Sequence, residues 1–260
     1  MDLGLAGKVA LVTGSSRGIG RAIAVTLAAE GCDVMLTGRD EAALKEVAAE
    51  IAKLGRKAQF STLDLREEKA SAALAAAVKK EFGRLDILVN NAGATTRGDF
   101  RKLTDAEWKD GFELKFFAHV RLARETWALL TVSRGSLITI AGIGGKEPEA
   151  EFGIGSSVNA ACVAWTKALA DVGKKEGVQV NAINPGRVET ERLWRRIRER
   201  SKSSGLDEAK VRGEFQQEFG ITRFGLTDDI AGLIAFIASP QGRWLHGTAI
   251  DMDGGEVRGV

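Results

Sequence analysis

Short apolar runs alternate along this chain with longer stretches in which apolar residues recur at helical spacing. The runs predict strands at residues 9–12, 34–37, 57–63, 85–89, 135–140, 179–184 and 248–252. The stretches predict helices from the first glycine turn to about 30, and at about 41–54, 67–82, 105–130, 156–175 and 228–238. Several strands are apolar without alternation, which indicates a sheet covered on both faces. The pattern predicts an α/β fold, a single doubly wound Rossmann-type domain whose parallel sheet has helices on both faces.

Three glycines join the first strand to the first helix, in the order Gly14, Gly18 and Gly20. Glycine allows a tight turn and a close approach of backbone to phosphate, and a helix N-terminus offers free N–H groups to an anion. A strand, a glycine turn and a helix in this order suit a dinucleotide. The glycine spacing alone also fits an ordinary strand-to-helix turn, so the choice between the two depends on motifs elsewhere in the chain.

A charged segment at about 191–219 follows the sixth strand. Its first ten residues include five arginines, and guanidinium groups bind carboxylates or phosphates through paired hydrogen bonds. The segment is therefore a candidate helical lid over an anionic substrate. The alternative is a solvated helix held by Glu–Arg pairs. Because no linker separates this segment from the remainder, we expect residues 1–260 to form one domain.

Composition excludes several classes of protein. The 37 Lys and Arg nearly balance the 35 Asp and Glu, and a net charge of +2 does not suggest a nucleic-acid partner. No apolar run approaches the length of a membrane span, and the first residues lack the features of a secretory signal. Cys32 and Cys162 are expected to be buried free thiols, and no spacing of Cys or His suits a metal. These features are typical of a cytoplasmic protein.

Four motifs in order make the sequence resemble the short-chain dehydrogenase/reductase family over nearly its whole length. They are TGSSRGIG at 13–20, NNAG at 90–93, NPGRVET at 184–190 and DGG at 253–255. In that family these motifs border a nicotinamide dinucleotide. The resemblance implies cofactor contacts from Gly14, Ser16, Arg17, Ile19, Gly20, Arg39, Asp64, Leu65, Asn90, Ala92, Gly93, Pro185, Gly186, Val188 and Thr190.

The family's chemistry normally rests on an Asn, a Ser, a Tyr and a Lys, whereas this sequence contains no tyrosine. The flanking sequence places Lys115 at the Asn position and Gly142 at the Ser position. It places Gly155 at the Tyr position and Asn159 at the Lys position. The resemblance thus implies a divergent member without the usual catalytic residues. Because both glycines remove a side chain near the reactive end of the cofactor, we expect a widened pocket.

The candidate catalytic residues are then Lys115, Ser156 and Asn159. A Lys115 amine that enters a desolvated site has a lowered pKa and can act as acid or base, whereas on the solvated side of its helix it has no such role. Ser156 offers a hydroxyl, although a serine that opens a helix is more often an N-cap. Asn159 can hydrogen-bond the cofactor ribose but carries no charge.

Two nearby groups of titratable residues have mainly structural interpretations. Glu147, Glu149 and Glu151 lie in the loop before the helix at 156–175 and fit a solvated acidic loop, although they can reach a pocket. His119 lies one helical turn after Lys115 on the same face, and a single histidine in a helix is more often structural.

The cofactor is predicted to be NADP(H), with NAD(H) as the alternative. Arg17 and Arg39 supply cations where a 2′-phosphate would lie. An NAD site usually has an acid at the end of the second strand, where this chain has Thr37, Gly38 and Arg39, and Asp40 comes one residue late.

Three functions fit these observations. The first is an NADP(H)-dependent oxidoreductase with a non-standard catalytic site that acts on a small molecule, which the arginines would allow to be anionic. The second is a dinucleotide-binding sensor or partner subunit without redox turnover. The third is a lyase or hydratase with Lys115 as base. The resemblance also implies a homodimer or homotetramer, formed through the helices at 105–130 and 156–175, where Phe117, Trp127 and Trp165 suit an interface or the core.

Overall fold

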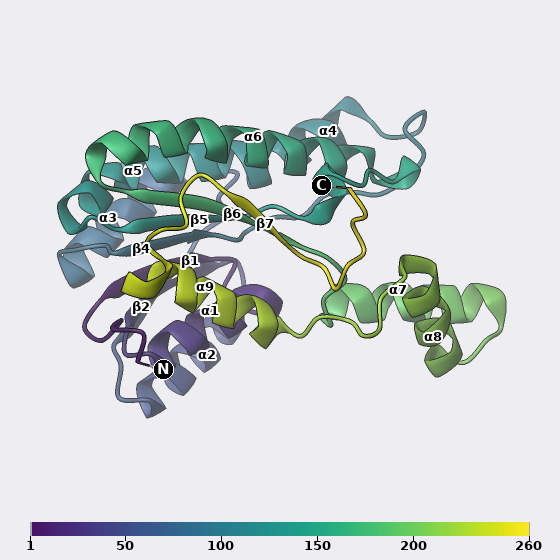
Figure 1. The fold of residues 1–260 in the computed structure, drawn as a ribbon, viewed down its shortest axis with the longest axis horizontal. Coiled ribbons are helices and arrows are strands. Elements are labelled where there is room, and N and C mark those ends of the chain that lie inside the picture. The colour runs from purple at the N-terminus through teal and green to yellow at the C-terminus, as the bar shows by residue number, and fades with distance from the viewer. Residues whose placement is uncertain (1, 260) are drawn as a thin grey trace.

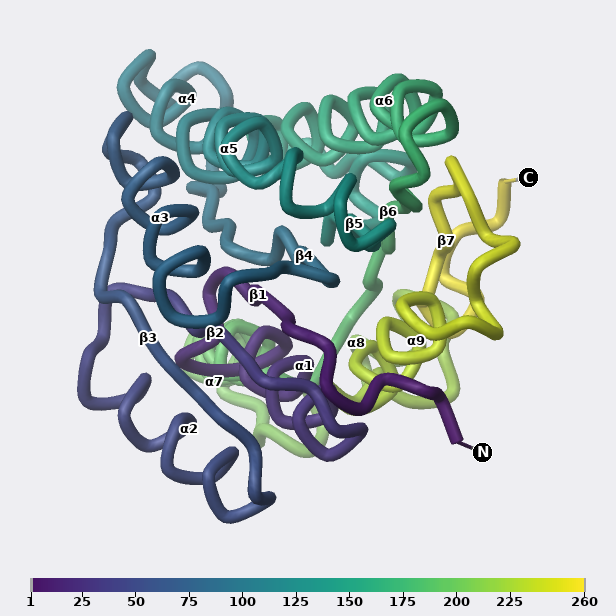
Figure 2. Tube along the Cα trace, turned by 90° about the vertical axis from the view of Figure 1, so that its left-hand side faces the viewer, coloured from purple at the N-terminus to yellow at the C-terminus, as the bar shows by residue number. Residues whose placement is uncertain are grey.

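The computed structural model describes residues 2–259 and contains, within them, one sheet of seven parallel strands. The strands follow the order β3-β2-β1-β4-β5-β6-β7, which can be followed across Figure 2. They are β1 (Val9–Thr13), β2 (Asp33–Gly38), β3 (Ala58–Thr62), β4 (Ile87–Asn90), β5 (Ser136–Ile140), β6 (Gln179–Pro185) and β7 (Ala249–Met252). Val12 pairs with Leu36 of β2 on one side and with Val89 of β4 on the other. The predicted α/β fold with a parallel sheet is confirmed.

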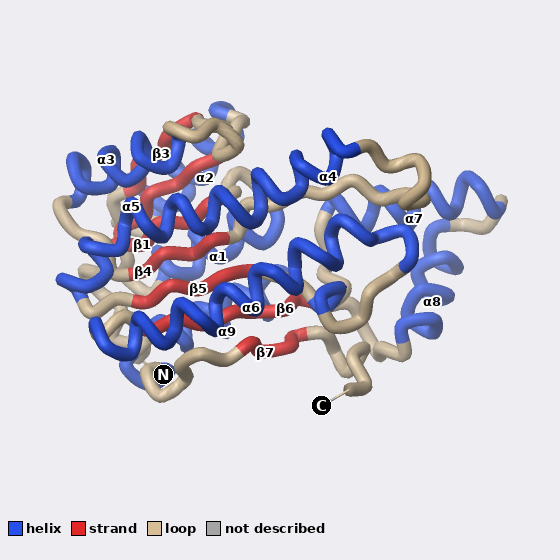
Figure 3. The backbone as a smooth tube through the Cα atoms, turned by 90° about the horizontal axis from the view of Figure 1, so that it is seen from above, coloured by secondary structure: helices blue, strands red, loops and turns tan. Residues whose placement is uncertain are grey.

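Helices cover both faces of this sheet (Figures 1 and 3). One face carries α1 (Gly18–Ala29), α2 (Glu41–Lys53) and α9 (Thr227–Ala238), and the other carries α3 (Ala70–Phe82), α4 (Asp105–Phe112), α5 (Ala118–Ser133) and α6 (Gly153–Glu176). No helix among residues 2–259 is long and apolar enough to cross a membrane.

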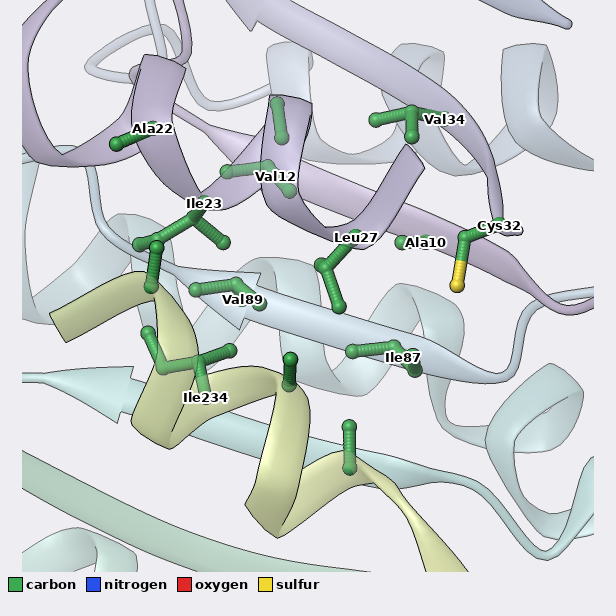
Figure 4. Close-up of a cluster of buried hydrophobic side chains, with 14 of the residues drawn as sticks. Ala10, Val12, Ala22, Ile23, Leu27, Cys32, Val34, Ile87, Val89 and Ile234 are labelled. Atoms are coloured by element: carbon green, nitrogen blue, oxygen red, sulfur yellow. The ribbon is translucent and has the colours of Figure 1, made fainter. Parts of the chain in front are cut away.

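The core between the sheet and α1 shows why the central strands lack alternation (Figure 4). Val12 and Val89 from the sheet, Ile23 and Leu27 from α1, and Ile234 from α9 are almost fully excluded from water. A second cluster fills the opposite face beneath α3, α5 and α6. Because apolar side chains on both faces are buried, the strands are apolar at consecutive positions. Cys32 and Cys162 are buried free thiols, as predicted.

The charged segment folds into two helices, α7 (Glu191–Ser204) and α8 (Glu208–Phe219), which lie beyond the end of the sheet (Figure 1). They share a small apolar cluster made by Leu193, Ile197, Val211, Phe215, Ile221 and Phe224. On the outer side, Glu191 pairs with Arg198, and Arg195 with Glu199. The helical prediction for this segment is confirmed, and the Glu–Arg pairs account for part of its charge.

Three helix predictions differ from the structure, two at their first residue and one in the interior of the helix. The helix predicted from 67 begins at Ala70, because residues 65–67 form a turn in which the Asp64 carboxylate accepts from Arg66 N. The helix predicted at 105–130 contains a π-helical turn over Glu113–Phe117. The helix predicted from 156 begins at Gly153 with Phe152 at its N-cap, so Ser156 lies inside the helix and caps nothing.

A cluster of hydrogen bonds ties the end of β1 to the end of β4. The Thr13 hydroxyl accepts from the backbone N–H groups of Asn91 (2.8 Å) and Ala92 (2.9 Å) and donates to the carbonyl of Val89 (3.3 Å). The Asn91 side-chain amide donates to the carbonyls of Thr13 (2.8 Å) and Gly14 (3.3 Å). The order of the strands reverses between β1 and β4, and such a reversal is where open α/β sheets bind ligands. We name this hydrogen-bonded group the Thr13–Asn91 clasp.

Replacing Thr13 by Val is expected to lower the free energy of unfolding by about 1–3 kcal/mol, because two backbone N–H groups lose their acceptor while the volume is kept. Urea denaturation measures the change. The matched control is Thr62→Val, at an exposed position whose hydroxyl has no hydrogen-bond partner among residues 2–259, where little change is expected. Equal effects of the two substitutions would show that the clasp does not stabilise the fold.

Candidate active site

The glycine turn after β1 lies at the carboxyl ends of the strands, the edge at which doubly wound sheets bind dinucleotides. We name the region between the segments that meet at this edge the cleft. Gly14 and Gly18 have φ of 66° and 56°, in the left-handed region that favours glycine. A side chain on Gly14 would lie 3.1 Å from the Cα of Ala92, and one on Gly20 would overlap the carbonyl of Gly14. The turn is therefore packed closely against the segment after β4, and a dinucleotide has exposed backbone to approach there.

The segment after β6 closes the cleft from the third side. Gly186 donates to the carbonyl of Met252 (3.1 Å), and a side chain on it would run into Asp253. Val188 forms a parallel bridge with Gly225, and the Thr190 methyl lies 3.6 Å from where a Gly18 side chain would begin. The three segments thus converge. They carry the predicted cofactor residues Gly14, Ser16, Arg17, Ile19, Gly20, Asn90, Ala92, Gly93, Pro185, Gly186, Val188 and Thr190.

Two residues of the predicted cofactor set have buried side chains. Asn90 is fully buried and donates to the carbonyl of His119 (3.4 Å), so it supports α5. Leu65 is only 4% exposed and packs in the core beside Leu74. These side chains serve the fold, and any contact from the two positions falls to the backbone.

The end of β2 carries the charges relevant to a ribose phosphate. Arg39 is mostly exposed, and the closest carboxylate to its guanidinium is that of Asp64, at 3.6 Å. Arg17 has no carboxylate within 4 Å among residues 2–259. Asp40 is occupied as the N-cap of α2, where its carboxylate accepts from Ala43 N (3.1 Å). Cations therefore outnumber free acids where the second strand ends.

Lys115 enters the cleft from the π-helical turn. Its ammonium donates to the carbonyl of Ala141 (2.6 Å) and to the side-chain oxygen of Asn159 (2.6 Å). Its aliphatic part passes directly over Gly93, where a side chain would lie 2.8 Å from the lysine Cδ. Of the two alternatives for Lys115, the solvated side of its helix does not match the structure, because the ammonium is turned inward onto Ala141 and Asn159. Single π-helical turns are frequent at functional sites, because they redirect one side chain.

Burial lowers the pKa of Lys115 to about 8. The cause is desolvation of the ammonium, and the nearby guanidinium of Arg192 lowers the pKa further, while Cys162 acts in the opposite direction. A group whose pKa lies near neutral pH can exchange protons during turnover.

His119 is structural, as the simpler interpretation had it. It is buried, and its Nε2 lies 2.9 Å from the carbonyl of Ala92, which accepts when that nitrogen carries the proton. Desolvation, with a contribution from Lys115, lowers the pKa of His119 to about 3. The imidazole is therefore neutral, and it holds the segment after β4 against α5.

The expected widened pocket is absent, because other side chains occupy the space. A methyl group on Gly155 would overlap the ring of Phe152, which also lies 2.9 Å from where a Gly144 side chain would begin. A side chain on Gly142 would lie 3.0 Å from the amide nitrogen of Asn159. The two glycines thus make room for a phenylalanine ring and an asparagine amide.

The position of Ser156 does not favour a catalytic role for its hydroxyl. It is 8% exposed, and its hydroxyl has no hydrogen-bond partner among residues 2–259. It makes no hydrogen bond to Lys115, whereas Asn159 bonds it directly. Of the three candidate catalytic residues, the structure joins two.

A network of arginines and acids occupies the side of the cleft that faces α7. The Glu149 carboxylate pairs with Arg97 and Arg187, and Arg187 also pairs with Glu256 (2.8 Å). The Arg97 guanidinium stacks on the ring of Phe152, 4.3 Å from its centre. The interpretation of Glu149 as part of a solvated loop is wrong, whereas Glu147 and Glu151 are exposed. Sequence reasoning missed this network, because its members are distant in the chain and only Arg187 belongs to one of the motifs.

No group of three or more His, Cys, Asp or Glu side chains within residues 2–259 is arranged to hold a metal ion.

Comparisons with known proteins agree with this geometry. A family model described as short chain dehydrogenase matches residues 8–201. The monensin polyketide synthase putative ketoacyl reductase of Streptomyces virginiae is 32% identical over 251 residues, 95% of this chain and 96% of that protein. The 3-oxoacyl-acyl-carrier-protein reductase FabG of Salmonella typhimurium is 31% identical over 250 residues, 96% of this chain and 97% of that protein.

A solved structure is similar over its full length. The crystal structure of L-sorbose reductase from Gluconobacter frateurii, complexed with NADPH and L-sorbose, has a TM-score of 0.96, 32% sequence identity and coverage of 100% of both chains. The similarity therefore extends through the segment that holds α7 and α8.

Gly155→Ala is expected to lower the free energy of unfolding by about 1–3 kcal/mol, because the new methyl group displaces the Phe152 ring. The double variant Gly155→Ala/Phe152→Ala is expected to lose less than the sum of the two single variants, because the clash disappears. Thermal denaturation measures all three. Gly213→Ala, in α8 with open space around it, is the control and should not destabilise the protein. Strict additivity would contradict the placement of Phe152.

Proposed function

This chain belongs to the short-chain dehydrogenase family, and on that premise we propose that it is an NADP(H)-dependent oxidoreductase in which Lys115 transfers the proton. Members of this family are NAD(P)-dependent oxidoreductases that act on small molecules. The observation that carries the proposal is the placement of the Lys115 ammonium, which is desolvated and fixed by Asn159 and Ala141.

The residues present fit the cofactor. The close-packed glycine turn leaves backbone free for the diphosphate, and Arg17 and Arg39 offer cations for a 2′-phosphate. When bound, NADPH supplies the hydride that a carbonyl carbon accepts. The similar L-sorbose reductase was solved with NADPH, which supports the same choice here.

The chain's own residues then provide the proton. An ammonium has three N–H donors, and Lys115 uses two of them on Ala141 and Asn159, so one N–H remains for a substrate oxygen. The two fixed bonds orient that third donor. As the substrate oxygen gains negative charge, the Lys115 proton moves to it and leaves a neutral amine, which its burial favours.

By the resemblance, Lys115 and Asn159 occupy two positions of the usual catalytic set, and the two residue types have changed places. The Asn position holds the lysine, and the Lys position holds the asparagine. Their side chains lie 2.6 Å apart, so the amine and the amide still form a pair across the cleft. We propose that this exchange, with Phe152 in the tyrosine's space, is the non-standard site of the protein.

The substrate is proposed to be a small carbonyl compound. Similar proteins are named as reductases of 3-oxoacyl groups and of L-sorbose, so oxoacyl thioesters and ketoses are the compounds to test first. We also propose that α7 and α8 form a lid over this substrate.

The protein is further proposed to be a homodimer or homotetramer, as is common in the family. Trp127 donates to Glu176 (2.7 Å), and Trp165 packs against Phe116, so these two aromatic residues serve contacts within the chain. Phe117 is 44% exposed and is the better candidate for an interface.

Lys115→Met is expected to lower NADPH-dependent carbonyl reduction by about 10²–10⁴-fold, because it removes the proton donor and keeps the apolar stem. Cofactor absorbance follows turnover, and fluorescence titration should show that NADPH still binds. The control is Lys109→Met, at an exposed position of α4. Unchanged turnover of Lys115→Met would remove this lysine from the mechanism. Absence of turnover in the parent protein, with tight NADPH binding, would favour a binding protein instead.

The reduction rate should also fall as pH rises through about 8, because the acid must be protonated and the pKa of Lys115 is about 8. Three titratable or charged groups face this ammonium: Arg192, Cys162 and the neutral His119. Lys115→Arg keeps the positive charge but cannot release a proton in this range. A pure electrostatic role predicts an active Lys115→Arg variant, and proton transfer predicts an inactive one.

Arg39→Asp is expected to weaken NADPH binding by about tenfold or more and to leave NADH binding within a few fold, because it replaces a phosphate-binding cation by an anion. Fluorescence titration with each cofactor measures this. The control is Arg124→Asp in α5, which is 70% exposed against 66% for Arg39. Equal affinity of the parent protein for the two cofactors would contradict the proposal.

A further inference from the structure

The wall of the cleft that faces α7 holds more positive charge than its acids neutralise. We name Arg97, Arg187, Arg192 and Arg196 the arginine cluster. Among residues 2–259, only Glu149 and Glu256 form ion pairs with it, and all three of these pairs are made by Arg97 and Arg187. With Lys115 included, five cations stand against these two carboxylates, and the carboxylate of Glu218 lies near Arg196 without forming an ion pair with it.

Two arginines of this cluster have no acid partner. Arg192 makes one hydrogen bond, to the carbonyl of Gly93 (3.0 Å), and lies near Arg17, Arg97 and Arg195. No carboxylate among residues 2–259 lies within 4 Å of its guanidinium, or within 4 Å of that of Arg196. Both belong to α7, and they follow each other at the i, i+4 spacing that places side chains on one face.

The burial of the Arg196 guanidinium costs free energy unless an anion binds beside it. It is partly buried, its guanidinium lies 5.7 Å from the centre of the Phe215 ring, and Arg97 and Arg187 are close neighbours. Burial and these two arginines lower the pKa of Arg196, and Glu149 and Glu218 oppose that shift from a distance, although guanidinium stays charged at every physiological pH. Burial of a cation without an ion-pair partner costs hydration free energy, and a bound anion offsets that cost.

On these grounds we infer that the arginine cluster binds a carboxylate or phosphate group of the substrate, with Arg192 and Arg196 of α7 as its direct ligands. This inference rests on the proposed function, because the anion is taken to be part of the reductase's substrate. Binding of the anion itself needs no turnover. Arg97 already bridges Glu149 and the Phe152 ring, so it supports the wall where the anion would lie. The lid would then be held closed by the substrate's own charge.

The test is binding of two probe anions, inorganic phosphate and succinate, to the NADPH-loaded protein. Saturation with NADPH first removes any site that belongs to the cofactor's own phosphates. Isothermal titration calorimetry measures affinity, and the fluorescence of Trp194, which is in α7, reports on the lid. Tighter binding of phosphate or of succinate identifies which anion the substrate carries.

Arg196→Gln is expected to weaken the preferred anion by about tenfold or more, and Arg192→Gln should act likewise. The matched control is Arg195→Gln in the same helix, whose side chain is 67% exposed and pairs with Glu199. Its affinity should stay within about twofold. Equal losses in all three variants would indicate diffuse attraction and overturn the inference, as would absence of anion binding in the parent protein.

Two further measurements separate the possible failures. Thermal melting of the variants checks that the fold persists, and Arg196→Lys, which keeps the charge without the planar fork, should recover part of the affinity. Lys115→Met loaded with NADPH should still bind the anion. If that variant binds the anion and the parent protein has no turnover, the proposed function fails and the anion site stands.

Discussion

The Thr13–Asn91 clasp is the constraint on which the site depends. The Thr13 hydroxyl accepts hydrogen bonds from two backbone N–H groups of the segment after β4. The Asn91 side-chain amide donates in the other direction, to the carbonyls of Thr13 and Gly14. These bonds fix the spacing of two walls of the cleft at the point where strand order reverses. Lys115 depends on the same segment, because it can cross to Asn159 only over a residue without a side chain, which is Gly93.

Most of the fold was predictable because it rests on local periodicity and on glycines with defined roles. Buried strands such as β1 and β4 are apolar at nearly every position, so covering on both faces is visible in the sequence. The π-helical turn at Glu113–Phe117 was not predictable, since its residues have the same spacing as an α-helix. The tertiary bonds of Lys115 to Asn159 and Ala141 accompany that turn, and no sequence window contains them.

The occupied space at Gly155 shows where reasoning from single positions fails. Loss of a side chain suggests a hole, but interiors are close-packed and a neighbour can supply the missing atoms. Here Phe152, only three residues earlier, places its ring in that space, and Arg97 stacks on the outer face of the ring. The absence of a catalytic tyrosine could therefore be predicted from composition alone. The position of the Phe152 ring in that space could be learned only from the structure.

The arginine cluster and Lys115, the proposed acid, are connected through charge. Arg192 is one of the groups that lower the pKa of Lys115, because a nearby cation disfavours a second positive charge. An anion bound to Arg192 would offset that repulsion and favour the protonated lysine. Binding of an anionic substrate would then raise the share of molecules in which Lys115 holds the proton it must give. A neutral substrate of the same shape would lack this effect, so selectivity would come from the state of the acid as well as from affinity.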